Sequence, residues 1–132
     1  MARLTQEMKD LIDRVRFCNA ATASRDGLPN VSPKGSIMWL DDETIAFCDF
    51  RSIHTRENLK TNPQIAVSIV DGDHGRFFQL KGTAELLGAG EMYRKIATRA
   101  LAKAKQRQGL DLPDPNNAVV IHVQETYRFP AA

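Results

Sequence analysis

The sequence predicts a mainly β protein of the α+β class, in which six strands form a small antiparallel barrel accompanied by helices. Three observations carry this prediction. Six stretches of strand length alternate or cluster apolar residues, and the first three are joined by turns too short for crossover helices. Helical patterns occur only at the start of the chain, in its middle and between the last two strands. Short connections favour local antiparallel pairing, so a parallel βαβ architecture is not expected.

The length and composition are those of a small globular protein. A chain of 132 residues is typical of one domain, which we expect to span residues 1–132. Hydrophobic residues make up 42% and charged residues 26%, both near the globular average, so the chain is expected to fold. A domain of this size needs no disulfide staples, but one copy cannot easily enclose a large ligand.

Charge and cysteine usage restrict the cellular setting. The formal charge of +2 is too balanced to indicate a nucleic-acid-binding protein. No apolar run approaches the roughly 20 residues of a membrane helix, and the mixed charges of residues 1–13 do not resemble a signal peptide. Cys18 and Cys48 lie in apolar runs without a CxxC motif. We therefore expect free, buried thiols in a cytoplasmic protein without a membrane partner.

The first expected element is an amphipathic helix over residues 4–15. We expect Thr5 to be its N-cap. Its apolar residues recur at helical spacing on one face: Leu4, Met8, Leu11, Ile12 and Val15.

From Phe17 the period of the pattern changes to two. Small residues over 17–24 predict a strand, and the following Asp26-Gly27 predicts a hairpin turn. The return strand is expected over about 30–40. A second turn and a third strand over 44–49 complete an antiparallel meander.

The middle of the chain leaves the strand pattern and then returns to it. Residues 52–61 suit a short helix, which Asn62-Pro63 ends because a residue before proline avoids helical geometry. Strands are predicted over 65–70 and 77–87. Gly82 lies inside the second of these and is expected to mark a bend of the barrel.

A long helix over residues 91–107 precedes the last strand, which is expected over 118–127. Within this helix, residues 94–107 carry six basic side chains and no acid, so the segment has a charge of +6 while the remainder has −4. One interpretation is a surface that binds a polyanion. The alternative is a solvated helix face whose basic residues suit the helix dipole. The sequence lacks the turn-helix partner and aromatic platforms of nucleic-acid-binding proteins.

The residues that usually carry hydrolysis or metal chemistry are not arranged for it. His54, His74 and His122 have no partner at metal-ligand spacing, so no metal site is predicted. No GxSxG elbow occurs, and two cysteines in apolar runs are weak candidates for a nucleophile. The sequence therefore leaves the catalytic residues unknown.

The stretch over residues 50–59 leaves a strand and enters a short helix. The hydroxyls of Ser52 and Thr55, the basic His54 and Arg56, and the backbone N–H groups of the turn could converge on one anion. The alternative is that Ser52 or Thr55 caps the helix. Spacing alone does not decide between the two.

A second candidate stretch covers residues 30–36. Lys34 and Gly35 lie in the middle of a predicted strand, where glycine is unfavourable unless something approaches the backbone closely. Lys34 would then project toward a bound anionic or electron-rich ring. The alternative is a lysine that protects an edge strand from aggregation.

Taken together, these stretches resemble the pyridoxamine 5′-phosphate oxidase-like, FMN-binding split-barrel family. The resemblance spans about residues 8–87, and the terminal helix and strand fit by their order. No single motif is decisive, but the ordered set is fairly specific. It comprises residues 18–24, 26–35, 41–47, 52–63 and 81–85.

This resemblance implies a six-stranded split barrel that forms a homodimer with two FMN sites at the subunit interface. Ser32, Pro33, Lys34 and Gly35 would lie beside the isoalloxazine ring. Ser52, His54, Thr55 and Asn58 would hold the ribityl phosphate. Phe50 and Arg51 would line the approach, and Gln79 would come from the partner chain. Many members of the family have lysine or arginine where this chain has His54, a difference for which Arg56 is expected to compensate.

The resemblance implies a flavoprotein, and our leading hypothesis is an FMN-dependent oxidoreductase that acts on an unidentified small molecule. Lys34 would stabilise negative charge on the reduced flavin. Oxidation of vitamin B6 itself is not expected, because the true vitamin B6 oxidases are longer and carry a basic C-terminal segment, whereas this chain has only Arg128 there. The alternatives are a flavin carrier or electron-transfer protein without a substrate, and a split barrel that binds haem or a deazaflavin.

Overall fold

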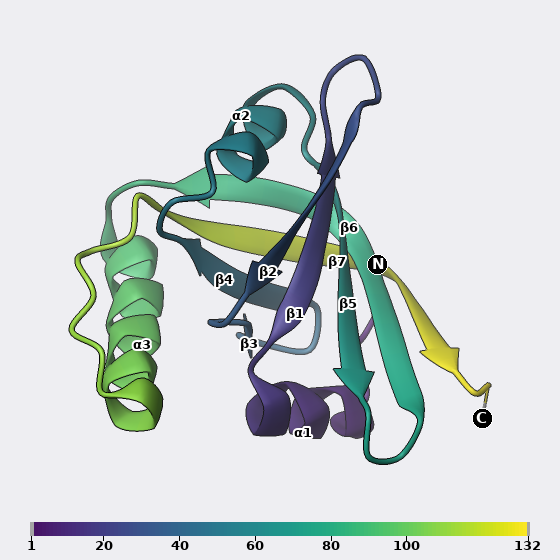
Figure 1. The fold of residues 1–132 in the computed structure, drawn as a ribbon. Helices are drawn as coiled ribbons and strands as arrows, with labels where there is room; N and C mark the ends of the chain where they lie inside the picture. The colour runs from purple at the N-terminus through teal and green to yellow at the C-terminus, as the bar shows by residue number, and fades with distance from the viewer. Residues whose placement is uncertain (1, 132) are drawn as a thin grey trace.

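The computed structural model describes residues 2–131, which form one curled antiparallel sheet with helices around it (Figure 1). Among these residues the seven strands follow the order β2-β1-β5-β6-β7-β4-β3. The strands are β1 (Cys18–Ala23), β2 (Pro29–Lys34), β3 (Met38–Trp39), β4 (Thr44–Asp49), β5 (Gln64–Asp71), β6 (Arg76–Leu87) and β7 (Asn117–Phe129). The helices are α1 (Gln6–Val15), α2 (Ile53–Thr61) and α3 (Glu91–Gln108). The predicted class is confirmed, and the sheet curls into a half-barrel.

The number of strands differs from the prediction because the strand expected over residues 30–40 is two strands. β2 pairs with β1 at one end of the sheet order, whereas β3 pairs with β4 at the other end. The chain changes edge at Gly35, and the hydroxyl of Ser36 accepts a hydrogen bond from the backbone N–H of Cys48 at 2.8 Å. The Ser36 side chain thus replaces a neighbouring strand as the hydrogen-bond acceptor for Cys48. The short segment between β2 and β3 joins the two ends of the sheet order.

Helix α1 begins as the sequence predicts. The Thr5 hydroxyl accepts a hydrogen bond from the N–H of Met8 at 3.2 Å, which is the expected N-cap. The apolar face of the helix is buried through Met8, Leu11 and Ile12. No helix among residues 2–131 is long and apolar enough to cross a membrane.

Strand β4 is buried on both faces and separates two apolar clusters. Ile45 and Phe47 belong to the larger cluster, which also contains the buried face of α1. Ala46 and Cys48 point the other way and belong to a cluster with α3. Because side chains alternate along a strand, this arrangement places α3 on the outer face of β4 and its neighbour β7. Figure 1 shows α3 standing beside these strands, away from α1.

Gly82 is required by a close approach of two strands. β6 has an irregularity in its pairing with β7 between Lys81 and Gly82. A Cβ atom at Gly82 would overlap the backbone carbonyl oxygen of His122 on β7. The predicted bend is therefore a place where the ladder closes too tightly for any side chain.

Asp71 ties α1 to the hairpin between β5 and β6. Its side chain is 1% exposed and accepts hydrogen bonds from Arg14 at 3.0 Å and Arg76 at 2.6 Å. These bonds, first that from Arg14 and then that from Arg76, lower the pKa of Asp71, and His74 acts in the same direction. The carboxylate is thus held ionised between Arg14 of helix α1 and Arg76 of strand β6.

Candidate functional site

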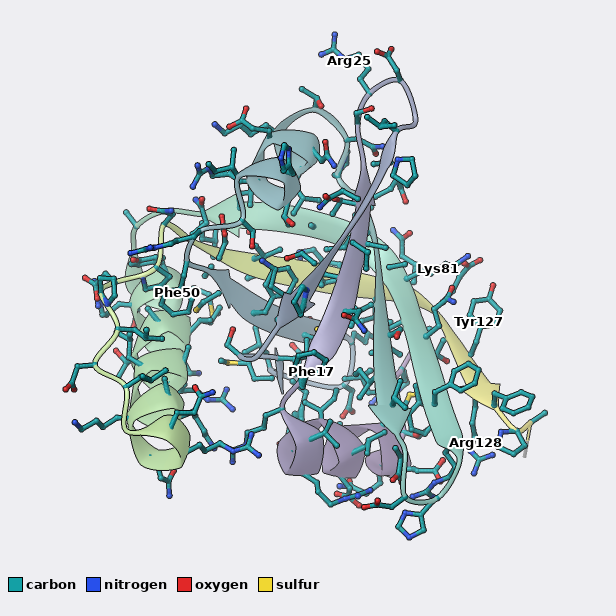
Figure 2. The ribbon with its side chains drawn as sticks, viewed as in Figure 1. Phe17, Arg25, Phe50, Lys81, Tyr127 and Arg128 are labelled. Atoms are coloured by element: carbon teal, nitrogen blue, oxygen red, sulfur yellow. The ribbon has the colours of Figure 1, made fainter. Side chains whose placement is uncertain are left out.

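A cavity of about 630 Å³ lies between helix α3 and two segments of the barrel. One wall consists of residues 33–36, at the end of β2. A second consists of residues 50–52, between β4 and α2. α3 and the chain after it form the facing wall, and residues 15–17 close one end. Figure 2 shows Phe50 near the upper end of α3 and Phe17 at the foot of β1, above α1.

The cavity unites the two stretches that the sequence singles out. Six of the predicted cofactor residues line it: Pro33, Lys34, Gly35, Phe50, Arg51 and Ser52. Ser32 lies directly behind them, because its hydroxyl oxygen is 3.4 Å from that of Ser52. These stretches are distant in the chain, and the change of edge at Gly35 brings them together.

Lys34 is a buried cation on the wall of this cavity. Its side chain is only 5% exposed, its amino group donates a hydrogen bond to the Ser52 hydroxyl, and Nζ lies 5.5 Å from the centre of the Phe47 ring. Burial lowers the pKa of Lys34, while the charge of Asp49 acts in the opposite direction. A lysine that only protects an edge strand would point into solvent, so the geometry favours a ligand-facing role.

Ser52 occupies the N-cap position of α2, but its hydroxyl makes no capping hydrogen bond. It faces Lys34 and Ser32 instead. The N–H of Ser52 donates to the carboxylate of Asp49 at 2.7 Å. The hydroxyl of Ser52 can therefore contact a ligand in the cavity, whereas its backbone N–H is already hydrogen-bonded to Asp49.

Asp49 is a member of the site that sequence reasoning missed. It is fully buried, and one carboxylate oxygen has no hydrogen-bond partner and lies 3.8 Å from Arg56. Its position at the end of a strand, three residues before a helix N-cap, was the available signal. Thr55, the third residue of α2, is also buried and has an unpartnered hydroxyl. Buried polar atoms without hydrogen-bond partners are uncommon in folded proteins, and two of them lie within seven residues of each other here.

The remaining predicted site residues, Thr55 among them, do not line the cavity of their own chain. His54 is exposed on α2, and the Asn58 amide donates to the Thr22 hydroxyl at 3.0 Å. Gln79 lies on β6, opposite Ser68 and Tyr127 in the strand register. Their assignment to the cofactor remains a prediction.

Sequence reasoning also missed the facing wall and the closed end of the cavity. α3 contributes Ala100, Lys103, Ala104 and Arg107, and the end is formed by Val15, Arg16 and Phe17. Residues 15–17 belong to no motif that the sequence singles out. The basic run over 94–107 was interpreted only as a polyanion surface or a solvated face, and the packing of α3 on β4 brings part of it to the site.

The histidines lie away from this cavity. His74 contacts the carboxylate of Asp71 at 3.0 Å, and His122 is exposed on β7. Within residues 2–131 no histidine lines the cavity, and no group of three or more His, Cys, Asp or Glu side chains is arranged to hold a metal ion.

Distant relatives share the architecture. An FMN-binding protein from Syntrophomonas wolfei is 18% identical with a TM-score of 0.71, covering 94% of this chain and 84% of its own. HutZ, the heme storage protein of Vibrio cholerae, is 16% identical with a TM-score of 0.74, covering 95% and 94%. An F420 reductase is 22% identical with a TM-score of 0.71. At these identities the likeness shows the fold alone.

Two relatives are more similar. HupZ of Group A Streptococcus is 30% identical, with a TM-score of 0.81, and the match covers 98% of this chain and 96% of HupZ. An uncharacterized protein of Methanocaldococcus jannaschii is 36% identical over an alignment of 134 positions, which covers 98% of this chain and 83% of that protein. The family model described as pyridoxamine 5′-phosphate oxidase matches residues 4–128. On this match the chain belongs to the pyridoxamine 5′-phosphate oxidase family.

Proposed function

We propose that this protein binds FMN and acts as an oxidoreductase on a small molecule, with the cofactor at the interface of two copies. The observation that carries the proposal is the cavity of about 630 Å³, which has the volume of a small-molecule site. Six residues expected to hold the cofactor line it from two walls, residues 33–36 and residues 50–52. Family membership and the FMN-binding relative support the same cofactor.

The residues present fit a flavin. A Cβ atom on Gly35 would meet no atom within 4 Å, so the space beside this backbone is open to a flat ring. Lys34 and Ser52 provide hydrogen-bond donors next to that space. The carboxylate of Asp49 accepts the hydrogen bond of the Ser52 N–H, and the hydroxyl of Thr22 accepts that of the Asn58 side-chain amide. We therefore assign the phosphate to the Ser52 hydroxyl and to Arg56 rather than to the Ser52 amide or Asn58.

FMN supplies hydride or single-electron transfer through its ring when it is bound. Lys34 would hold a positive charge against the ring, where it stabilises negative charge that develops during reduction. Ser52 keeps the Lys34 amino group in place through their hydrogen bond. The buried carboxylate of Asp49 favours the protonated state of Lys34 and so preserves this charge.

The outer face of β6 and β7 is the surface we propose for the partner copy. It carries large exposed apolar side chains, and the rings of Phe77 and Phe129 stack at 5.1 Å between their centres. Tyr127 is 51% exposed on the same face, opposite Gln79 in the register. Figure 2 shows Tyr127 pointing away from the barrel on the side opposite α3. Sizing combined with light scattering tests this interface, because a dimer has twice the mass of one chain.

Reconstitution of the full chain tests the proposed cofactor. The protein is incubated with FMN and desalted, and we expect retained flavin absorbance with quenched fluorescence. A preparation that retains no flavin contradicts the proposal. Parallel incubations with haem and with a deazaflavin identify the competing cofactors, haem by a Soret band. The haem alternative has less support here, because no histidine among residues 2–131 lines the cavity.

A second measurement separates an enzyme from a carrier. The FMN-loaded protein is mixed with NADH or NADPH in air, so that dioxygen can reoxidise the reduced flavin, and consumption of the nucleotide is followed over many equivalents. Steady consumption supports an oxidoreductase. A single equivalent consumed, followed by no turnover, supports a flavin carrier or electron-transfer protein.

A further inference from the structure

Five basic side chains and no acidic side chain line the cavity. They come from separate parts of the chain: Arg16, Lys34, Arg51, Lys103 and Arg107. A concave surface lined by charges of one sign focuses the electric field and concentrates oppositely charged ligands. The charges that line the cavity therefore favour anionic ligands, with or without a flavin bound beside residues 33–36.

None of these five cations forms an ion pair among residues 2–131. On the outer side of the same helix, Arg94 pairs with Asp114 at 3.1 Å and Lys105 pairs with Asp111 at 3.0 Å. Among residues 2–131, no ion pair involves Arg16, Lys103 or Arg107. The two basic side chains of α3 that line the cavity are thus among the unpaired cations of the helix, together with Lys95 and Arg99, which lie outside the cavity.

The unpaired cations also crowd one another. The pKa of Lys103 is lowered, first by partial burial and then by the charges of Arg16 and Arg99, with Arg107 adding to the effect. Asp13 opposes the shift only in part. Like charges held this close are unfavourable in the folded protein, and a bound anion is the group that would offset them.

The space between the cations is apolar. Ala100 and Ala104 face it from α3, and Leu112 and Phe17 lie at its margins with 37% and 49% of their surfaces exposed. Phe17 is seen beside β1 in Figure 2. An apolar floor with cations around it suits a ring that carries anionic substituents, because the ring buries apolar surface while the substituents meet the guanidinium and ammonium groups.

We propose that the cavity binds a second ligand beside the flavin, an organic anion whose ring carries at least two carboxylate or phosphate groups, recognised by Arg16, Lys103 and Arg107. The identification of this anion as the substrate rests on the proposed function, since it requires flavin in the same cavity. Binding of the anion itself does not require flavin. The basic face of α3 is thus a specificity-determining surface rather than a general polyanion surface.

The test uses the full chain and a set of simple probes. Binding of benzene-1,3,5-tricarboxylate and of benzoate is measured by calorimetry, with and without FMN. We expect the tricarboxylate to bind at least roughly tenfold more tightly than benzoate, because it makes added charge-assisted hydrogen bonds. Its affinity should fall when the salt is raised from about 50 mM to about 500 mM, since salt screens exposed charges.

The variants are Lys103→Gln with Arg107→Gln, and Lys95→Gln as the matched control. Lys95 lies on the same helix, is exposed and does not line the cavity. We expect the affinity of the double variant for the tricarboxylate to fall roughly tenfold or more, while its affinity for FMN is unchanged. The Lys95→Gln control should keep both affinities.

Three results would overturn the inference: no binding of the tricarboxylate, an equal loss in the Lys95→Gln control, or a loss of FMN affinity in the double variant. The last result would mean that these cations hold the cofactor's own phosphate. A chain that binds the tricarboxylate as expected but takes up no FMN refutes the proposed function and leaves the anion site supported.

Discussion

Replacing Lys34 with methionine removes the buried cation of the cavity and keeps the bulk of the side chain. Lys34 is 5% exposed, and its amino group donates a hydrogen bond to Ser52. No acid among residues 2–131 forms an ion pair with it. The variant therefore removes a charge that the fold keeps at a desolvation cost, which is the behaviour expected of a ligand-binding group.

The magnitudes follow from these contacts. A hydrogen bond to a charged group contributes about 1.5–3 kcal/mol, so FMN affinity should fall roughly 10- to 150-fold. The stability of the apoprotein should change by only about 1 kcal/mol, because the lost bond to Ser52 is offset by relief from burying an ammonium group. That change corresponds to a shift of the thermal midpoint of about 5 °C or less.

The assay combines quenching of flavin fluorescence with thermal unfolding of the apoprotein. Lys95→Met serves as the matched control, since Lys95 is exposed on α3. A pH series adds a second readout. Because burial lowers the pKa of Lys34, the positive charge is lost at a lower pH than for an ordinary lysine, and wild-type FMN affinity should fall there as the pH rises. Affinity of the Lys34→Met variant should not show this fall.

Equal FMN affinity of wild type and Lys34→Met would refute the assignment of Lys34 to the cofactor. A large drop in the thermal midpoint of the variant apoprotein would show that Lys34 acts on the fold instead.

The other predictions concern the scaffold. Gly82→Ala should destabilise the fold by about 1–3 kcal/mol, because the added Cβ overlaps the carbonyl of His122; urea denaturation measures this, and unchanged stability would contradict the close approach. The pKa of Asp71 is lowered chiefly by Arg14, so its ionised state stabilises the fold above the unfolded-state pKa, and stability should fall as the pH is lowered below about 4. Asp71→Asn should flatten that acid limb in denaturation curves. Burial raises the pKa of Cys18 to about 12, so iodoacetamide at pH 8 should label it only after unfolding, as mass spectrometry reports.

Much of the fold follows from local pattern. The expected strand over residues 44–49 and the Thr5 cap match the structure, because alternation and capping depend on neighbouring residues only. The division of the expected strand at Gly35 depends on which strands stand at the two ends of the sheet. That information lies in long-range pairing, which no local window contains.

The same distinction applies to the site. Sequence patterns selected Lys34 and Ser52 as candidates, and the structure joins them through a hydrogen bond. Asp49 was missed because it ends an ordinary strand, and its importance appears only through burial and an unpartnered oxygen. The sequence placed Lys103 in a basic helix but did not place Arg16 beside it, because the packing of α3 against the barrel brings the two to one cavity.

The most direct test of the central claim is the structure of the protein crystallised with FMN. We expect flavin density in the cavity between residues 33–36 and residues 50–52, with the ring within hydrogen-bonding reach of Lys34. Flavin density at another surface, with this cavity left to solvent, would refute the assignment of the cavity to FMN.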